Sequence, residues 1–267
     1  MVRRLFCGLL ALLMLVFGLL VSSPGEAQAL EYHGSKSYES GKYYQRLTQV
    51  RMTKDPRTNI VRIALSQVGY QEGNNSKQLS GEIYGKGNCT EYGRWYGIQA
   101  MWCAMFVSWC ADVAGVSTKV IPKHSYTPEG LAWFKARGRA YTGKQVLAGK
   151  YIPQPGDIVY FRSDRNKNPT NHVGIVTDYR AGYLYTVEGN ASSKTIDTNG
   201  GTIAQKVYHV SDKYIVAICC PNYITLGNVR PAVVSAYVPC RCHDQQNLLD
   251  APDELQFIQN PLILYER

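Results

Sequence analysis

The 267-residue chain predicts an α+β domain, with helices in its first half and an antiparallel sheet in its second. Two observations support this class. Between residues 58 and 130 apolar residues recur with helical spacing, whereas between residues 158 and 220 short β-branched and aromatic runs are separated by turn residues. Helices followed by a meander of strands are typical of a domain whose helices pack on one face of one sheet.

Residues 1–29 predict a secretory signal peptide. Arg3 and Arg4 precede an apolar run of 17 residues, a polar break follows, and Ala27-Gln28-Ala29 fits a cleavage site. An uncleaved anchor is the alternative, because 17 residues is near the lower length of a membrane span. We favour cleavage after Ala29. The chain is therefore expected to be secreted, outside the cell or in the cell wall, and to meet a membrane only if this segment is retained.

The charge of the chain is strongly positive, with a formal net charge of +9. Removal of the signal segment takes away two arginines and one glutamate, which leaves +8. The basic residues are scattered, and no compact basic stripe with interleaved aromatic residues is present, so we expect no nucleic-acid partner. A positively charged secreted protein is suited to binding an anionic cell surface, although a role of the charge in solubility explains it equally well.

The first half of the mature chain predicts three helices and two irregular segments. Residues 30–57 have no clear period and are expected to form a linker or a loose arm, and residues 71–90 are polar and rich in glycine, as in a loop. The expected helices cover residues 58–69, residues 103–114 with Gly115 as the stop, and a shorter segment with Thr127 as N-cap and Pro128 in the first position.

The second half predicts five strands after a turn at residues 153–157. Residues 225–267 show no convincing period and are expected to form a tail of unknown role. No internal repeat is found. The expected strands are 158–161, 172–177, 183–188, 203–210 and 214–220.

Seven cysteines remain after removal of the signal segment, so at least one thiol is free if the others pair. Six paired cysteines allow 15 connectivities. Cys219 and Cys220 are adjacent on an expected strand and point to opposite faces, so a bridge between them is disfavoured. A zinc cluster of these two with Cys240, Cys242 and His243 lacks the usual spacing of structural sites and ranks below disulfides or free thiols. We expect no metal and no cofactor.

Cys103 is the candidate nucleophile. It lies at the expected start of an amphipathic helix, where unpaired backbone N–H groups and the positive end of the helix dipole favour a thiolate. A lone cysteine on an apolar helix face is more often a core residue, so this assignment depends on partners. Cys110, two turns further along the same face, keeps the core interpretation.

His172 and Glu188 lie on two expected strands joined by Arg180-Ala181-Gly182. A three-residue turn pairs residues whose numbers sum to 362, which sets Asn190 opposite His172 and places Glu188 diagonally from it on the same face. A two-residue turn would put His172 on the other face. The catalytic interpretation therefore requires a particular register.

These residue types suit amide hydrolysis. A thiolate attacks the carbonyl, an imidazole maintains the thiolate and protonates the leaving amine, and an acceptor on the second ring nitrogen orients the imidazole. Cys103 is the expected nucleophile, His172 the base and Glu188 the orienting group, with Asn190 as a secondary orienter. The backbone N–H of Cys103 is a candidate oxyanion donor.

Four segments together resemble the CHAP family of cysteine- and histidine-dependent amidohydrolases/peptidases: residues 102–109, 154–159, 172–176 and 188–190. The resemblance implies a papain-like α+β catalytic domain over residues 58–224 and the same roles for Cys103, His172, Glu188 and Asn190. It implies a bacterial peptidoglycan hydrolase, either an N-acetylmuramoyl-L-alanine amidase or a peptide-bridge endopeptidase. Some relatives bind calcium through an acidic loop before the cysteine.

The loop at residues 71–88 holds only Glu72 and Glu82 as acidic residues, so no calcium site is expected.

Two alternatives remain open alongside this interpretation. The first is also an enzyme, a related papain-like peptidase that acts on the cell wall. The non-enzymatic alternative is a wall-binding or adhesion module on the same scaffold, which predicts a blocked or disulfide-bonded Cys103.

Overall fold

A single antiparallel sheet with strand order β1-β6-β2-β3-β4-β5 organises the part of the chain that the computed structural model describes, residues 30, 32–163, 168–192 and 199–223. The five expected strands are all present. β1 is an addition, and its two residues are too few to show a period. The strands are β1 (Ala140–Tyr141), β2 (Ile158–Phe161), β3 (His172–Arg180), β4 (Tyr183–Ala191), β5 (Thr202–His209) and β6 (Ile215–Cys219).

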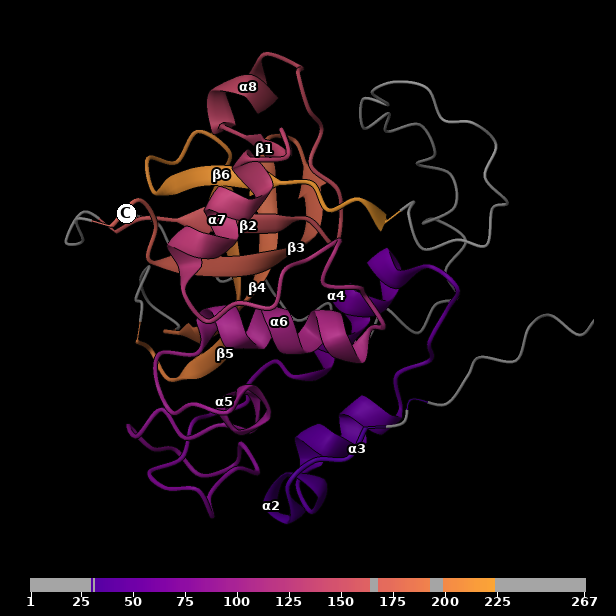
Figure 1. The fold of residues 1–267 in the computed structure, drawn as a ribbon, viewed down its shortest axis with the longest axis vertical. Coiled ribbons are helices and arrows are strands. Elements are labelled where there is room, and N and C mark those ends of the chain that lie inside the picture. The colour runs from indigo at the N-terminus through magenta and orange to yellow at the C-terminus, as the bar shows by residue number, and fades with distance from the viewer. Residues whose placement is uncertain (1–29, 31, 164–167, 193–198, 224–267) are drawn as a thin grey trace, which may run out of the picture.

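The helices precede the sheet in the chain, which confirms the α+β class. The helix α6 lies against the sheet, α4 contacts both α6 and strand β3, and α5 and the N-terminal helices lie on the far side of α6 from the sheet (Figure 1). The helices are α2 (Lys36–Glu39), α3 (Lys42–Thr48), α4 (Pro56–Ser66), α5 (Glu91–Tyr96), α6 (Cys103–Val113), α7 (Thr127–Lys135) and α8 (Gly143–Leu147).

The ends of the expected helices differ slightly from the prediction. Asp55 is the N-cap of α4, and its side chain accepts from the N–H groups of Arg57 and Thr58. Tyr126, not Thr127, is the N-cap of α7. The hydroxyl of Thr127 instead donates to the carbonyl of Thr170, which ties the start of α7 to the segment leading into β3.

The segment expected as a linker or loose arm packs against the domain. It forms α2 and α3, and Tyr38 and Leu47 are fully buried. The phenol of Tyr38 donates to Gln67 Oε1 at 2.8 Å, and that of Tyr32 donates to Glu91 Oε1 at 2.8 Å. Residues without a helical period are thus held by aromatic packing and buried polar partners, which a search for periodicity does not detect.

Apolar side chains fill both faces of the sheet. The larger cluster lies between the sheet and the helices and includes Trp109, Phe106 and Cys219, and the smaller covers the other face and includes Phe161 and Cys220. Adjacent residues of β6 and its end thus enter different clusters, as predicted for Cys219 and Cys220. None of the five cysteines in the described part of the chain forms a disulfide.

The β3–β4 hairpin has the predicted register at Ile175, but its turn and its strand pairing near the turn differ from the prediction. Its turn has two residues, Ala181 and Gly182, with φ of 50° and 82°, so the three-residue turn was wrong. Near the turn Arg180 pairs with Tyr183, but a bulge between Val176 and Asp178 shifts the register by one residue. Beyond the bulge Ile175 pairs with Val187, which is the register that the catalytic interpretation requires.

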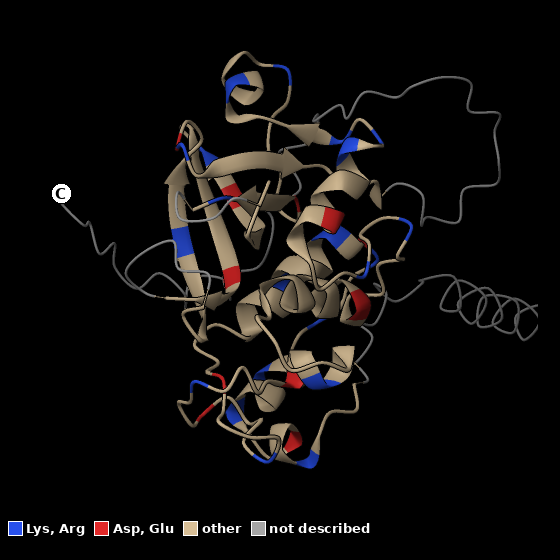
Figure 2. Ribbon diagram, turned by 60° about the vertical axis from the view of Figure 1, so that its left-hand side comes forward, with Lys and Arg blue, Asp and Glu red and all other residues tan. Residues whose placement is uncertain are grey.

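Charged residues are distributed over helices, strands and loops (Figure 2). No helix within residues 30, 32–163, 168–192 and 199–223 is long and apolar enough to cross a membrane. The expected signal peptide, the tail at residues 225–267, and Cys240, Cys242 and His243 lie outside the described residues.

Candidate active site

Cys103 is the first residue of α6, as predicted, and its side chain is a free thiol that is 4% exposed. The N-cap is Trp102, whose carbonyl accepts from the N–H of Phe106 at 2.9 Å. The first N–H groups of a helix have no partner within it, so they are available at the position of the thiol. A Cβ at Gly189 would lie 2.7 Å from Cβ of Phe106, which shows how closely α6 packs on β4.

Glu72 holds the residue before the nucleophile. Its buried carboxylate accepts from Nε1 of Trp102 at 2.8 Å, and its own N–H donates to the carbonyl of Gly201 at 2.9 Å. Glu72 therefore links the start of α6 to the start of β5. In the sequence Glu72 stands out only as one of two acidic residues in a polar loop, because nothing there pairs it with a tryptophan 30 residues away.

His172 and Glu188 form the predicted pair. Nε2 of His172 lies 2.9 Å from Oε2 of Glu188, and both side chains are 1% exposed. Nδ1 of His172 is buried and has no hydrogen-bond partner among the described residues. Because Glu188 occupies Nε2, Nδ1 is the nitrogen left to serve the thiol of Cys103.

The charge state of His172 reflects both neighbours. Burial alone lowers the pKa of an imidazole, but the interactions with Cys103 and then with Glu188 outweigh burial and raise the pKa of His172 well above its ordinary value. An imidazolium between a thiolate and a carboxylate is the form that both neighbours stabilise. The raised pKa therefore favours the imidazolium form of His172 at neutral pH, the form that can give a proton to a leaving amine.

Asn190 lies at the end of β4 with φ of 55°, a left-handed conformation. Its Oδ1 accepts from the N–H of Gly201 at 3.1 Å, and its Nδ2 donates to Oδ1 of Asn199 at 3.2 Å. Asn190 thus fastens the start of β5 beside the site. Glu188 is the acceptor on Nε2 of His172, and a secondary orienting role for Asn190 stays a prediction.

The raised pKa of His172 predicts the alkaline limit of activity. The imidazolium is the proton donor to the leaving amine, so activity should persist above pH 6.5, the ordinary pKa of histidine, and fall only as the pH rises through the higher pKa of His172. Replacing Glu188 with glutamine removes one cause of the raised pKa and should move this alkaline limb to lower pH. Rates measured from pH 5 to 10 test this, and an unmoved limb in Glu188→Gln would contradict it.

Gly174 leaves the space that Glu188 occupies. A Cβ at this position would lie 2.6 Å from Cγ of Glu188, so Gly174→Ala should displace the carboxylate from His172. We expect a loss of activity on the order of tenfold to a hundredfold, because a hydrogen bond to a charged group is lost or lengthened. Steady-state kinetics with a thermal melt as the fold control checks this. Wild-type kinetics in a folded Gly174→Ala protein would show that the orientation of Glu188 does not matter.

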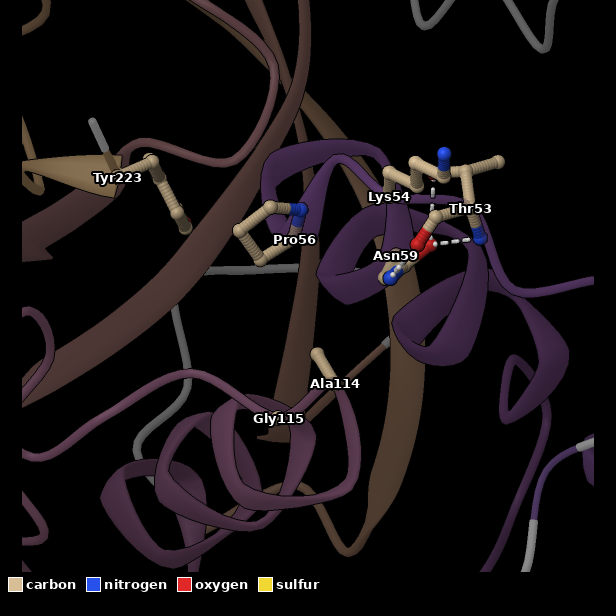
Figure 3. A pocket seen from close by; sticks show the side chains of 7 residues that line it. All are labelled: Thr53, Lys54, Pro56, Asn59, Ala114, Gly115 and Tyr223. Carbon is tan, nitrogen blue, oxygen red and sulfur yellow. Dashed lines mark hydrogen bonds between the residues drawn. The ribbon is translucent and has the colours of Figure 1, made fainter. Parts of the chain in front are cut away.

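A surface hollow of about 220 Å³ lies between α4 and the C-terminal end of α6 (Figure 3). It is lined by Thr53, Lys54, Pro56, Asn59, Ala114, Gly115 and Tyr223. With a rise of 1.5 Å per helical residue, this end of α6 is roughly 16 Å from Cys103. The hollow is therefore separate from the site around the thiol.

A thiol at a helix start beside an imidazole–carboxylate pair from a sheet is the arrangement of cysteine hydrolase sites. Residues 95–190 match the model of the CHAP domain, consistent with the resemblance that the sequence motifs indicated. Cys103, His172, Glu188 and Asn190 all fall within the matched residues. Domains of this family are generally hydrolases of the amidase or peptidase type that act on peptidoglycan.

A search of curated proteins gave no match. The solved structure "The crystal structure of Ly7917" is 16% identical to this chain with a TM-score of 0.36, and the alignment covers 62% of each chain, so this chain spans less than two thirds of that structure.

Proposed function

We propose that this protein is a secreted cysteine hydrolase that cleaves amide bonds of peptidoglycan. The observation that carries the proposal is the state of His172: Nε2 is held by Glu188 at 2.9 Å, while Nδ1 is buried, unpaired and available to Cys103 at the start of α6. The match of residues 95–190 to the CHAP domain supports a wall amide as the substrate class.

The proposed reaction has two steps. The thiolate of Cys103 attacks the amide carbonyl, and the backbone N–H of Cys103 is placed to donate to the oxyanion. As the C–N bond breaks, His172 gives its proton to the leaving amine, and a thioester to Cys103 remains. Water, deprotonated by His172, then attacks the thioester and releases the carboxylic acid and the free thiol.

Purified peptidoglycan tests the proposal directly. We expect the protein to release free amines from it, and mass spectrometry of the soluble fragments to show whether the bond to the muramic acid or a bond within the peptides is cut. Cys103→Ala should abolish the release, whereas Cys110→Ala, a thiol on the same helix, should retain it. Binding to peptidoglycan without any release of amines by the wild-type protein would favour the wall-binding module instead.

A further inference from the structure

The carboxylate of Glu188 accepts from two groups besides His172. Thr186 donates from Oγ1 to Oε1 of Glu188 at 2.6 Å, and Tyr208 donates from its phenol to Oε2 at 3.2 Å. Oε2 also lies 2.9 Å from Nε2 of His172. The two oxygens are thus distinguished: Thr186 holds one of them, and Tyr208 and His172 share the other.

These contacts lie in the interior, where an isolated carboxylate would be unstable. Thr186 and Glu188 are each 1% exposed and Tyr208 is 8% exposed. Burial without hydrogen-bond donors favours the neutral form of a carboxyl group, and a neutral group would not stabilise an imidazolium. Tyr208 stays a donor because burial, and then the charge of Glu188, raise the pKa of its phenol far above the ordinary value.

The fold explains how the two donors reach one carboxylate. Thr186 is two residues before Glu188 on β4, so both side chains leave the same face of the sheet. Tyr208 comes from the neighbouring strand β5, and Ala204, the residue paired with Glu188, is small. The ring of Phe161 packs between Tyr208 and His172, with distances between ring centroids of 4.8 Å and 5.9 Å. The phenol of Tyr208 and the imidazole of His172 therefore share one packing neighbour.

We propose that Thr186 and Tyr208 are positioning residues, which hold the carboxylate of Glu188 turned toward His172 and thereby maintain the reactivity of Cys103. The inference rests on the proposed function, because it assigns roles within the same reaction. Neither residue touches the thiol, so each acts only through Glu188 and His172.

The rate at which iodoacetamide alkylates Cys103, measured by mass spectrometry from pH 5 to 10, tests the proposal without any wall substrate. Thr186→Val keeps the shape and removes the hydroxyl, and Tyr208→Phe removes only the phenol oxygen. Each should lower the alkylation rate at neutral pH roughly tenfold and shift the midpoint of the pH profile upward, because one hydrogen bond to a charged group is lost. Thr186→Ser, which keeps the hydroxyl, should restore the wild-type profile.

A double-mutant comparison separates positioning from general destabilisation. In a Glu188→Gln background no carboxylate remains to be held in place, so Thr186→Val should change the alkylation rate by no more than about twofold. Thermal melts confirm that each variant is folded. Wild-type pH profiles in folded Thr186→Val and Tyr208→Phe, or effects that simply add to that of Glu188→Gln, would overturn the inference. A wild-type Cys103 that reacts no faster than Cys110 would instead overturn the proposed function.

Discussion

Replacing His172 with alanine should reduce the rate of amide hydrolysis on the order of a thousandfold or more. The imidazole has two roles in the site, since it stabilises the thiolate of Cys103 and it protonates the leaving amine. Its Nε2 is held by Glu188 at 2.9 Å, and its Nδ1 has no hydrogen-bond partner among the described residues. Removal of the ring should therefore lower both the reactivity of Cys103 and the turnover of bound substrate.

The measurements are initial rates of amine release and rates of Cys103 alkylation at neutral pH. His209→Ala is the matched control, because His209 is an exposed histidine of β5 whose ring bonds to Oγ of Ser211 at 2.7 Å. This control should retain wild-type rates. A folded His172→Ala protein with activity within tenfold of the wild type would exclude His172 as the general acid–base group.

The helices and strands that sequence predicted best are those with a sustained period. The helices α4 and α6 and the five long strands bury one face or both, so their apolar spacing indicates their type. The helices α5 and α8 have six and five residues, too few for a period to show. Their caps, Thr90 and Thr142, are visible in the sequence but are no more distinctive than threonines in loops.

The hairpin shows why a correct register can follow from a wrong turn. The prediction counted residues from a three-residue turn, and the structure has a two-residue turn followed by a bulge at the level of Thr177. Each change shifts the register by one residue, and the two cancel at Ile175. A bulge depends on the local twist and packing of both strands, which the sequence of either strand does not specify.

The residues of the candidate site also fall into two groups, those that the sequence indicated and those that only the structure shows. Cys103, His172 and Glu188 were predicted because their chemistry restricts the possible residue types and a motif surrounds each one. Glu72 and Tyr208 were missed because each supports the site through one long-range or cross-strand hydrogen bond, which no local pattern marks. Thr186 was missed although it lies only two residues before Glu188, because a threonine on a strand is too common to indicate a hydrogen bond to that carboxylate. Groups that position catalytic residues are therefore found from coordinates and not from sequence spacing.

A buried ion pair joins α4 to the start of β2. Asp157 is fully buried, and its Oδ1 lies 3.0 Å from Nη1 of Arg57. The phenol of Tyr151 donates to the second carboxylate oxygen, and so does the N–H of Gln154 at 2.9 Å. Residues 153–157 were predicted to form a turn, and Asp157, the last of them, also holds α4 in place through its pair with Arg57.

Asp157→Asn should lower the free energy of unfolding by about 3 kcal/mol, because it removes one partner of a buried pair and leaves Arg57 without its counter-charge. Urea denaturation at neutral pH measures the change, and an unchanged m-value would show that the extent of unfolding is the same. Asp178→Asn is the matched control. Asp178 pairs with Arg180 at 3.3 Å, but side-chain exposures of 44% and 67% make this an exposed pair, whose loss should cost no more than about 0.5 kcal/mol. Equal effects of the two substitutions would mean that Asp157 contributes no more than a surface charge, and that packing alone holds α4 on the sheet.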